Sequence, residues 1–174
     1  MKATTLATAN GETTFALVFD KGDEVIGELT EFAQRQALTA AHFTAIGAFS
    51  DVTLGYFDRA RRDYRRIPVA EQVEVLALLG DIALDDGRPK VHAHVVVGRS
   101  DASTAGGHLL AAHVWPTLEL VLSESPSHLR RRMDRETGLA LIELAPPAPS
   151  SGTPPPDNPR NAHPDPTKIP MMAP

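Results

Sequence analysis

Three histidines around one predicted hairpin are the residues of this sequence best suited to chemistry. His92 and His94 lie two positions apart in an apolar, β-rich run, so their side chains leave the same face of a strand. If the chain reversal that follows is centred near Asp101, His108 lies opposite His94, with the two Cβ atoms about 4.5–5.5 Å apart. Three imidazoles on one patch with a fourth position open match the ligand set of a catalytic-type zinc site. The spacing predicts that His92, His94 and His108 bind a divalent metal, with zinc as the expected ion.

The same spacing also fits three polar residues on an exposed or subunit-facing strand, and spacing alone leaves both interpretations open. Gly106 and Gly107 come directly before His108 and favour the metal site, because paired glycines allow a close backbone approach or a bulge that re-aims the next side chain. His113 has the opposite parity to His108 and is expected to face away from it. The remaining histidines, interpreted as ordinary polar residues, are His42, His128 and His163.

Two carboxylates are candidates for a catalytic role beside such a metal. Metal-assisted chemistry needs a proton acceptor nearby. Glu74 and Glu119 lie in predicted strands, and we assign them this role as a hypothesis. The alternative, which stays open, is that each is a structural partner of an arginine or of a backbone donor.

A basic segment with one aromatic residue is the candidate for contact with nucleic acid. Arg61, Arg62 and Tyr64 fall in a predicted loop between two strands, where the Tyr64 ring is available to stack on a base. The formal net charge of −5 opposes general binding to phosphate backbones. An acidic chain favours the alternative, in which these arginines pair with carboxylates across a subunit interface.

The elements that must position these residues are mostly strands. The runs that predict strands are Thr13–Phe19, His42–Phe49, Asp51–Phe57, Val73–Leu84, Val91–Val97, His108–Val114, Thr117–Ser123 and Leu139–Leu144. One helix is predicted over about 24–38 with Asp23 as its cap, and a second is opened by Ser125 and Pro126 and closed by Gly138. Many strands with two helices indicate an α+β fold built largely on antiparallel sheet.

Composition divides the chain of 174 residues near Ala145. Of its 15 Pro, 11 lie in residues 145–174, a segment too poor in large apolar side chains to offset the entropy of ordering. We predict one domain over 1–144 and a disordered Pro-rich tail over 145–174. The chain has no Cys, which excludes disulfide scaffolds and thiolate chemistry. No apolar run reaches the ~18 residues of a membrane span and no signal peptide is recognised, so a cytoplasmic location without membrane contact is expected.

Five segments in the right order resemble the plants-and-prokaryotes-conserved (PPC) domain family. They are IGAFSDVTLGYF at 46–57, VEVLALLGDIA at 73–83, VHAHVVVGR at 91–99, GGHLL at 106–110 and PTLEL at 116–120. Each segment alone is a modest signal, and their common order makes the assignment specific. The resemblance covers about residues 15–144, essentially the whole predicted domain.

This resemblance implies an α+β domain that assembles as a homotrimer, with a metal site at His92, His94 and His108. It also implies a fold similar to that of acetolactate decarboxylase, a zinc lyase. Plant members carry a separate AT-hook that binds the DNA minor groove, and bacterial members are called DNA-binding by association. Here residues 87–90 match only part of a hook, and Asp85 and Asp86 before them oppose insertion between phosphates.

Three functions are compatible with these observations. The first is a PPC-domain protein with a three-histidine metal site and a DNA-associated or regulatory role. The second is a metal-dependent lyase or hydrolase that acts on a small carbonyl or ester substrate, so enzymatic activity is left open. The third is a non-catalytic trimer that binds a small molecule. DNA binding predicts an affinity that falls steeply with salt, whereas metal catalysis predicts a stoichiometric ion.

Overall fold

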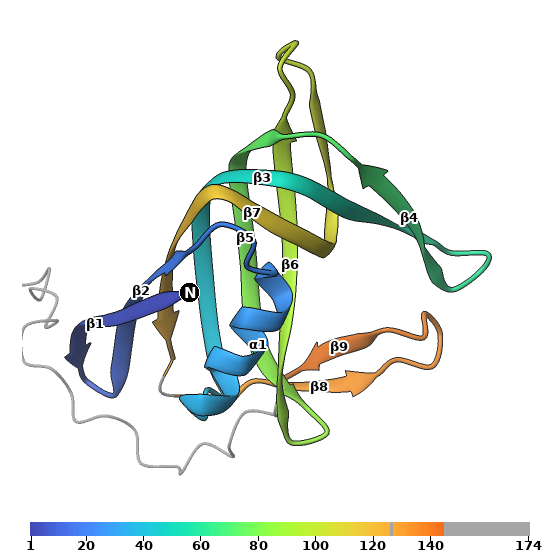
Figure 1. The fold of residues 1–174 in the computed structure, drawn as a ribbon. Helices are drawn as coiled ribbons and strands as arrows, with labels where there is room; N and C mark the ends of the chain where they lie inside the picture. The colour runs from blue at the N-terminus through green and yellow to red at the C-terminus, as the bar shows by residue number, and fades with distance from the viewer. Residues whose placement is uncertain (126, 145–174) are drawn as a thin grey trace, which may run out of the picture. The chain divides into compact units, whose positions relative to one another are not determined.

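Strands dominate the part of the chain that the computed structural model describes, residues 1–125 and 127–144 (Figure 1). Its elements are β1 (Lys2–Ala9), β2 (Glu12–Phe19), α1 (Val25–Arg35), β3 (Ala40–Asp58), β4 (Asp63–Val69), β5 (Val73–Asp85), β6 (Arg88–Gly98), β7 (Thr104–Glu124), β8 (Arg130–Met133) and β9 (Ala140–Glu143). The predicted α+β class with largely antiparallel pairing is confirmed. The predicted tail over 145–174 lies outside the described residues.

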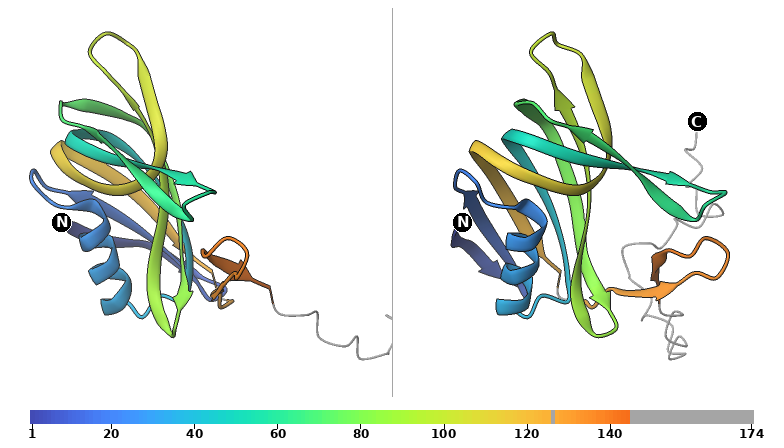
Figure 2. Two further views of the ribbon diagram at one scale, coloured as in Figure 1. Left: turned by 90° about the vertical axis from the view of Figure 1, so that its right-hand side faces the viewer. Right: turned by 45° about the vertical axis from the view of Figure 1, so that its right-hand side comes forward.

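Four strands pair in a closed circuit that forms the centre of the sheet. β3 pairs with β5 and β7, and β6 also pairs with both β5 and β7. β2 pairs with β7 and β1 pairs with β2, so these two strands extend the sheet on that side. β4 pairs with the C-terminal part of β3, and β8 contacts β5 through one parallel residue pair. Figure 2 shows the β8–β9 hairpin projecting from the end of β5, on the same side of the domain as β4.

Helix α1 covers the inner face of this sheet and closes the core. Val25, Leu29, Phe32 and Ala33 recur at helical spacing and are all buried, and the helix contacts β6 and β7. Strand residues alternate in the same way, so that Ala93, Val95 and Val97 of β6 face inward and the residues between them face outward. With 11 residues, α1 is too short to span a membrane, and none of the described residues form a helix that could.

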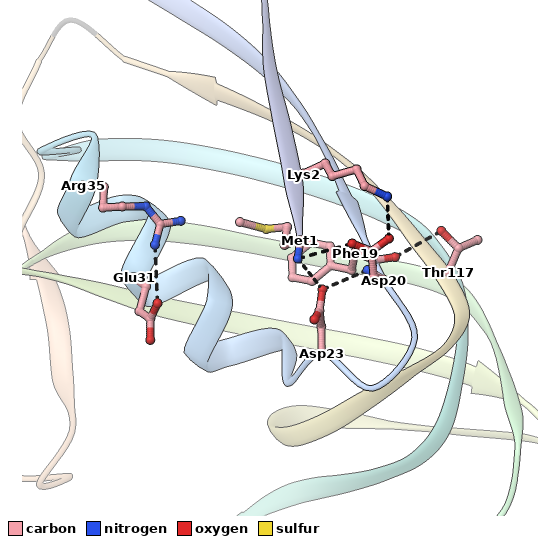
Figure 3. Close-up of polar contacts among 8 residues, drawn as sticks. All are labelled: Met1, Lys2, Phe19, Asp20, Asp23, Glu31, Arg35 and Thr117. Atoms are coloured by element: carbon pink, nitrogen blue, oxygen red, sulfur yellow. Dashed lines mark hydrogen bonds and ion pairs between the residues drawn. The ribbon is translucent and has the colours of Figure 1, made fainter.

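The helix begins one residue later than the sequence predicts. Glu24, not Asp23, is the N-cap residue, and its carboxylate accepts a hydrogen bond from the Gly27 N–H at 2.6 Å. Asp23 instead accepts a hydrogen bond from the Asp20 N–H at 2.8 Å and lies 2.7 Å from the Met1 ammonium (Figure 3). The carboxylate of Asp23 therefore ties the start of β1 to the turn before α1.

The second predicted helix, between Ser125 and Gly138, is wrong: the described residues there form the β8–β9 hairpin. The Asp134 carboxylate accepts hydrogen bonds from the Thr137 N–H at 2.8 Å and the Thr137 hydroxyl at 2.6 Å, and Gly138 adopts φ +75°. Side chains that cap helices thus stabilise a hairpin turn here. Pro126, the predicted first helical residue, lies outside the described residues.

Several strands are longer than the sequence predicts. β3 and β7 each run without interruption through segments predicted as two strands, and β7 already begins at Thr104, four residues before the predicted strand that starts at His108. The basic segment after β3 is also partly a strand, because β4 begins at Asp63. A tight turn at Asp86 and Gly87, both with positive φ, joins β5 to β6.

Candidate metal centre

The three histidines predicted to converge lie together on the outer face of β6 and β7. His94 is paired directly with His108, as the predicted hairpin register requires, and His92 lies two residues earlier on the same face. The three ring centroids are each 5.2 Å apart. One nitrogen from each ring lies within 4.8 Å of the others, which makes this the candidate metal cluster of the described residues.

Two glycines allow the chain to approach this cluster closely. A Cβ on Gly107 would lie 2.9 Å from the carbonyl oxygen of Gly55, and a Cβ on Gly55 would lie 2.9 Å from Cδ1 of Tyr64. Tyr64 of β4 occupies the space above Gly55 and stacks on the His108 ring, with centroids 4.5 Å apart and an angle of 24° between the rings. The Gly-Gly pair before His108 therefore has the role of close approach that the sequence indicates.

Asp81 on β5 is the carboxylate that contacts the histidines. One of its oxygens lies 3.3 Å from His92 Nδ1, and the other accepts a hydrogen bond from Nη2 of Arg131 on β8. Burial alone would raise the pKa of Asp81, but the hydrogen bond with His92 and the charge of Arg131 outweigh it and lower this pKa. An ionised carboxylate on the outer nitrogen of a histidine is the usual partner that orients a metal ligand.

The state of the other two rings suits metal binding. Burial, with a smaller contribution from the charges of His92, His94 and Arg131, lowers the pKa of His108 to about 4. Burial and the charge of His92 also lower the pKa of His94. Both rings are therefore neutral at pH 7 and offer a lone pair. His108 Nδ1 is buried and has no hydrogen-bond partner among the described residues, and a metal ion would supply one. The residues present thus fit a three-histidine zinc site.

A cavity of about 190 Å³ adjoins His92 and His108, whereas His94 is not part of its lining. It is lined by Tyr64, Lys90, Val91, His92, His108, Arg131, Leu139, Ala140 and Leu141. The β8–β9 hairpin forms one wall, so the segment predicted as a helix is the element that encloses the site. This enclosure makes the cluster a place where a small molecule is able to meet a bound metal.

Neither predicted catalytic glutamate lines this cavity. Glu119 is exposed on β7, beside the apolar groove on the outer face, and Glu74 is exposed on β5, where it pairs with Gly98. Sequence reasoning missed Asp81, although a signal for it exists. The Asp86–Gly87 turn fixes the β5–β6 register, and that register places Asp81 directly opposite His92.

The predicted nucleic-acid contacts separate into two groups. Arg61 and Arg62 are exposed in the turn between β3 and β4, where Arg62 adopts φ +53°. Tyr64 instead directs its ring at His108, and it makes an edge-type contact with Phe57, with ring centroids 5.4 Å apart. One face of the Tyr64 ring is therefore occupied by the histidine cluster.

The outer face of the sheet also carries an apolar groove of about 530 Å³. The large apolar side chains exposed beside it include Ile46 (62%), Leu79 (57%), Leu76 (53%), Val121 (47%) and Val18 (40%). One cross-strand row connects this groove to the cluster through successive pairs of Ala16, Val121, Thr44, Leu79, His94 and His108. We call these exposed apolar residues the apolar face.

Comparisons with known proteins agree with this architecture. A family model described as the Plants and Prokaryotes Conserved (PCC) domain matches residues 6–126. The chain is similar to a plant- and prokaryote-conserved protein of Pyrococcus horikoshii, with 27% identity, 83% of this chain and 96% of that chain covered, and a TM-score of 0.72. A search of curated proteins found no match.

Two further solved structures are similar at higher identity. One is a metal-containing protein of Archaeoglobus fulgidus, 32% identical over 75% of this chain and 93% of that chain, with a TM-score of 0.70. The other is a protein of Ralstonia eutropha provisionally named as DNA-binding, 30% identical over 81% of this chain and 96% of that chain, with a TM-score of 0.73.

Proposed function

The chain belongs to the Plants and Prokaryotes Conserved domain family, and from this premise we propose that it binds zinc through His92, His94 and His108. The observation that carries the proposal is the convergence of three rings with centroids 5.2 Å apart. One of these rings has a buried nitrogen without a hydrogen-bond partner in the part of the chain that the structure describes. The metal-containing A. fulgidus protein, 32% identical, adds support. Three protein ligands leave one coordination position for a small molecule.

The surrounding side chains have distinct roles in this proposal. Asp81 holds the His92 ring through Nδ1, and Tyr64 fixes the plane of His108. When bound, zinc supplies a Lewis acid that polarises an oxygen of the ligand. A lyase or hydrolase acting on a small carbonyl or ester substrate is the catalytic version of this proposal, with Asp81 rather than Glu74 or Glu119 as the carboxylate in contact with the histidines.

Elemental analysis of the purified protein tests the metal site. We expect one zinc per chain in the wild type, and loss of the ion in His94→Ala. His113→Ala is the matched control, because His113 is exposed on β7 and lies outside the cluster. A protein that contains no metal and takes up none when zinc is added would contradict the proposal.

A homotrimer is the second element of the proposal, and the apolar face is the surface that supports it. Five large apolar side chains lie 40–62% exposed around one groove, an arrangement typical of a protein interface rather than of free surface. The number of copies follows from the family resemblance. Light scattering coupled to size-exclusion chromatography tests the homotrimer. We expect a mass three times that of one chain. A monomer at micromolar concentration would contradict it.

DNA association is a second candidate function, because the R. eutropha protein with that provisional name is 30% identical over 81% of this chain. The exposed Arg61 and Arg62 in the β3–β4 turn are the contacts we assign to phosphates. Fluorescence anisotropy with duplex DNA at 50 and 200 mM salt tests this candidate. We expect affinity to fall steeply with salt and to be lost in Arg61→Glu/Arg62→Glu. No binding at the lower salt removes it.

A further inference from the structure

Arg131 places a buried cation with an unused donor beside the histidine cavity. Its side chain is only 6% exposed, although it belongs to a short hairpin at the edge of the sheet. Nη2 donates to Asp81 and Nη1 donates to the Ala140 carbonyl at 3.1 Å. Nε is buried and has no partner among the described residues. A buried N–H without an acceptor is unfavourable, so this donor favours a ligand that brings an oxygen.

The charges around the cavity favour an anion as that ligand. Arg131 is paired with Asp81, and Lys90 is paired with Asp85 at 2.6 Å, so these two cations are already balanced. Imidazoles that ligate a metal are neutral and add no charge. A divalent ion held by the three histidines would therefore leave two positive charges uncompensated in a partly enclosed site. An anionic ligand compensates part of this charge.

The remaining walls limit what the anion carries. Val91, Leu139, Ala140 and Leu141 are apolar, and the cavity volume is about 190 Å³. Cavities for drug-sized ligands are larger, at roughly 300–1,000 Å³. A short aliphatic chain matches both the lining and the volume.

From these observations we propose that the cavity binds a small aliphatic monocarboxylate, with one carboxylate oxygen at the open metal position and the other accepting from Arg131 Nε. This inference rests on the proposed metal site, and it names the class of ligand for that site. The carboxylate satisfies the unused donor and the metal charge together, while its alkyl chain contacts the apolar wall.

Cobalt-substituted protein provides the test, because the visible absorption of tetrahedral cobalt responds when a ligand enters its open position. Titration with butyrate is expected to change this spectrum, and its neutral isostere butyramide is expected to leave it unchanged at the same concentration. Acetate lacks two methylenes and is expected to bind roughly 15-fold more weakly, since each buried methylene contributes about 0.8 kcal/mol.

Two neighbouring arginines provide the matched variants. Arg131→Gln removes the Nε donor, and we expect butyrate affinity to fall about tenfold or more, as for other charge-assisted hydrogen bonds. Arg132→Gln is the control, since Arg132 lies on the same hairpin, is 75% exposed and pairs with Glu143. If Arg131→Gln does not fold because Asp81 loses its partner, Arg131→Lys keeps a cation for Asp81, lacks the Nε donor and carries the same expectation.

The possible results distinguish failure of the carboxylate proposal from failure of the proposed metal site. If cobalt binds one per chain but butyrate and butyramide act alike, or Arg131→Gln binds butyrate like the wild type, the carboxylate proposal is wrong and the metal site stands. If cobalt does not bind at all, both proposals are overturned.

Discussion

The histidine cavity and the apolar face share only strand β7, and their side chains differ in the kind of contact that they lack. Beside the cavity, His108 Nδ1 and Arg131 Nε are buried and have no hydrogen-bond partner within residues 1–125 and 127–144. On the apolar face, Ile46 and Leu79 are 62% and 57% exposed to solvent. Polar atoms beside the cavity lack hydrogen-bond partners, whereas apolar side chains on the apolar face lack apolar neighbours that would shield them from solvent. A buried polar atom without a partner indicates a ligand, whereas an exposed cluster of apolar side chains indicates another protein surface.

One cross-strand row joins the two regions, with Leu79 paired to His94 and His94 paired to His108. The row changes from apolar to histidine where Tyr64 stacks on His108 and the β8–β9 hairpin forms a wall. Outward-facing residues of this row therefore differ in role, because Tyr64 and the β8–β9 hairpin cover only its histidine end. The predictions below test whether the two regions are separable.

Gly80 lies between Leu79 of the apolar face and Asp81 beside the histidines, and its substitution is expected to have the largest effect. A Cβ at this position would lie 2.2 Å from Cζ of Phe43 in the core and 2.6 Å from the backbone oxygen of His92. Gly80→Ala is expected to lower the free energy of unfolding by about 3 kcal/mol, since neither atom is free to move away. Denaturant titration at fixed protein concentration measures this change.

Gly98→Ala is the matched control for this substitution. Its Cβ would meet Leu76 Cδ1 at 3.3 Å, and the end of that exposed side chain is able to rotate. We expect a loss below about 1 kcal/mol. Equal losses in both variants would show that close packing at Gly80 does not position the strands.

Ile46→Asp is expected to disrupt the apolar face and leave the cavity intact. Ile46 is 62% exposed and lies away from the histidine row, so a carboxylate at this position is solvated. Its repulsion with Glu119, the directly opposite residue on β7, is expected to cost less than about 1 kcal/mol. We expect self-association to weaken roughly 100-fold, about 2.7 kcal/mol, while the metal content per chain stays unchanged. Light scattering and elemental analysis of the same sample measure both quantities.

Met133→Asp is the control for this variant, because Met133 is 60% exposed but lies on β8, away from the apolar groove. It is expected to keep the wild-type mass. A wild-type mass for Ile46→Asp would refute the assignment of this face as the interface. Loss of metal together with the mass would show that the site needs a second copy of the chain.

Local patterns predicted the convergence of the histidines but not the walls around them. The alternation of His92 and His94 and the short distance to His108 within one hairpin set the β6–β7 register, and the structure confirms it. The contact of Arg131 with Asp81 joins residues 50 positions apart. No local pattern reports such a contact.

The wrong prediction of a second helix also results from long-range contacts that local sequence patterns do not show. Ser125 and Gly138 are typical of helix ends, yet the segment between them places the Arg131 side chain against Asp81 and closes its turn through Asp134. Tertiary contacts outweighed local propensity there. The missed carboxylate differs, since the Asp86–Gly87 turn and strand parity were sufficient to place Asp81 opposite His92.

Tyr64→Ala is expected to weaken zinc binding modestly without removing it. The Tyr64 ring stacks on His108 at 4.5 Å and limits rotation of that ring, but it provides no ligand. Loss of such a stacked pair corresponds to about 1 kcal/mol, or roughly fivefold in affinity. Competition with a chelator measures the constant. Tyr56→Ala is the control, because Tyr56 is 62% exposed and its ring faces Arg65 instead.

His113 on β7 provides the smallest effect and contrasts with His108 on the same strand. His113 Nδ1 lies 2.9 Å from Asp51, and this hydrogen bond raises the pKa of His113 and lowers that of Asp51. The charge of Glu24, whose backbone forms an isolated β-bridge with that of His113, also raises the pKa of His113. Because the pKa of His113 is raised in the folded state, its contribution is complete below the unfolded value of about 6.5 and is lost as pH rises through the folded value.

The lowered pKa of Asp51 sets the other limit, because its contribution is complete above the unfolded value of about 4 and is lost as pH falls through the folded value. The pair is therefore fully charged between about pH 4 and 6.5. Both side chains are about half exposed, so we expect His113→Gln to lower the free energy of unfolding by only a few tenths of a kcal/mol at pH 5.5, and by less at pH 8. Denaturant titrations at the two pH values measure this difference, with His42→Gln as the exposed control. A larger loss of unfolding free energy at pH 8 than at pH 5.5 would contradict the ion pair between His113 and Asp51. It would also remove the contrast between His113, which is paired with a carboxylate, and His108, whose nitrogen is available to a metal.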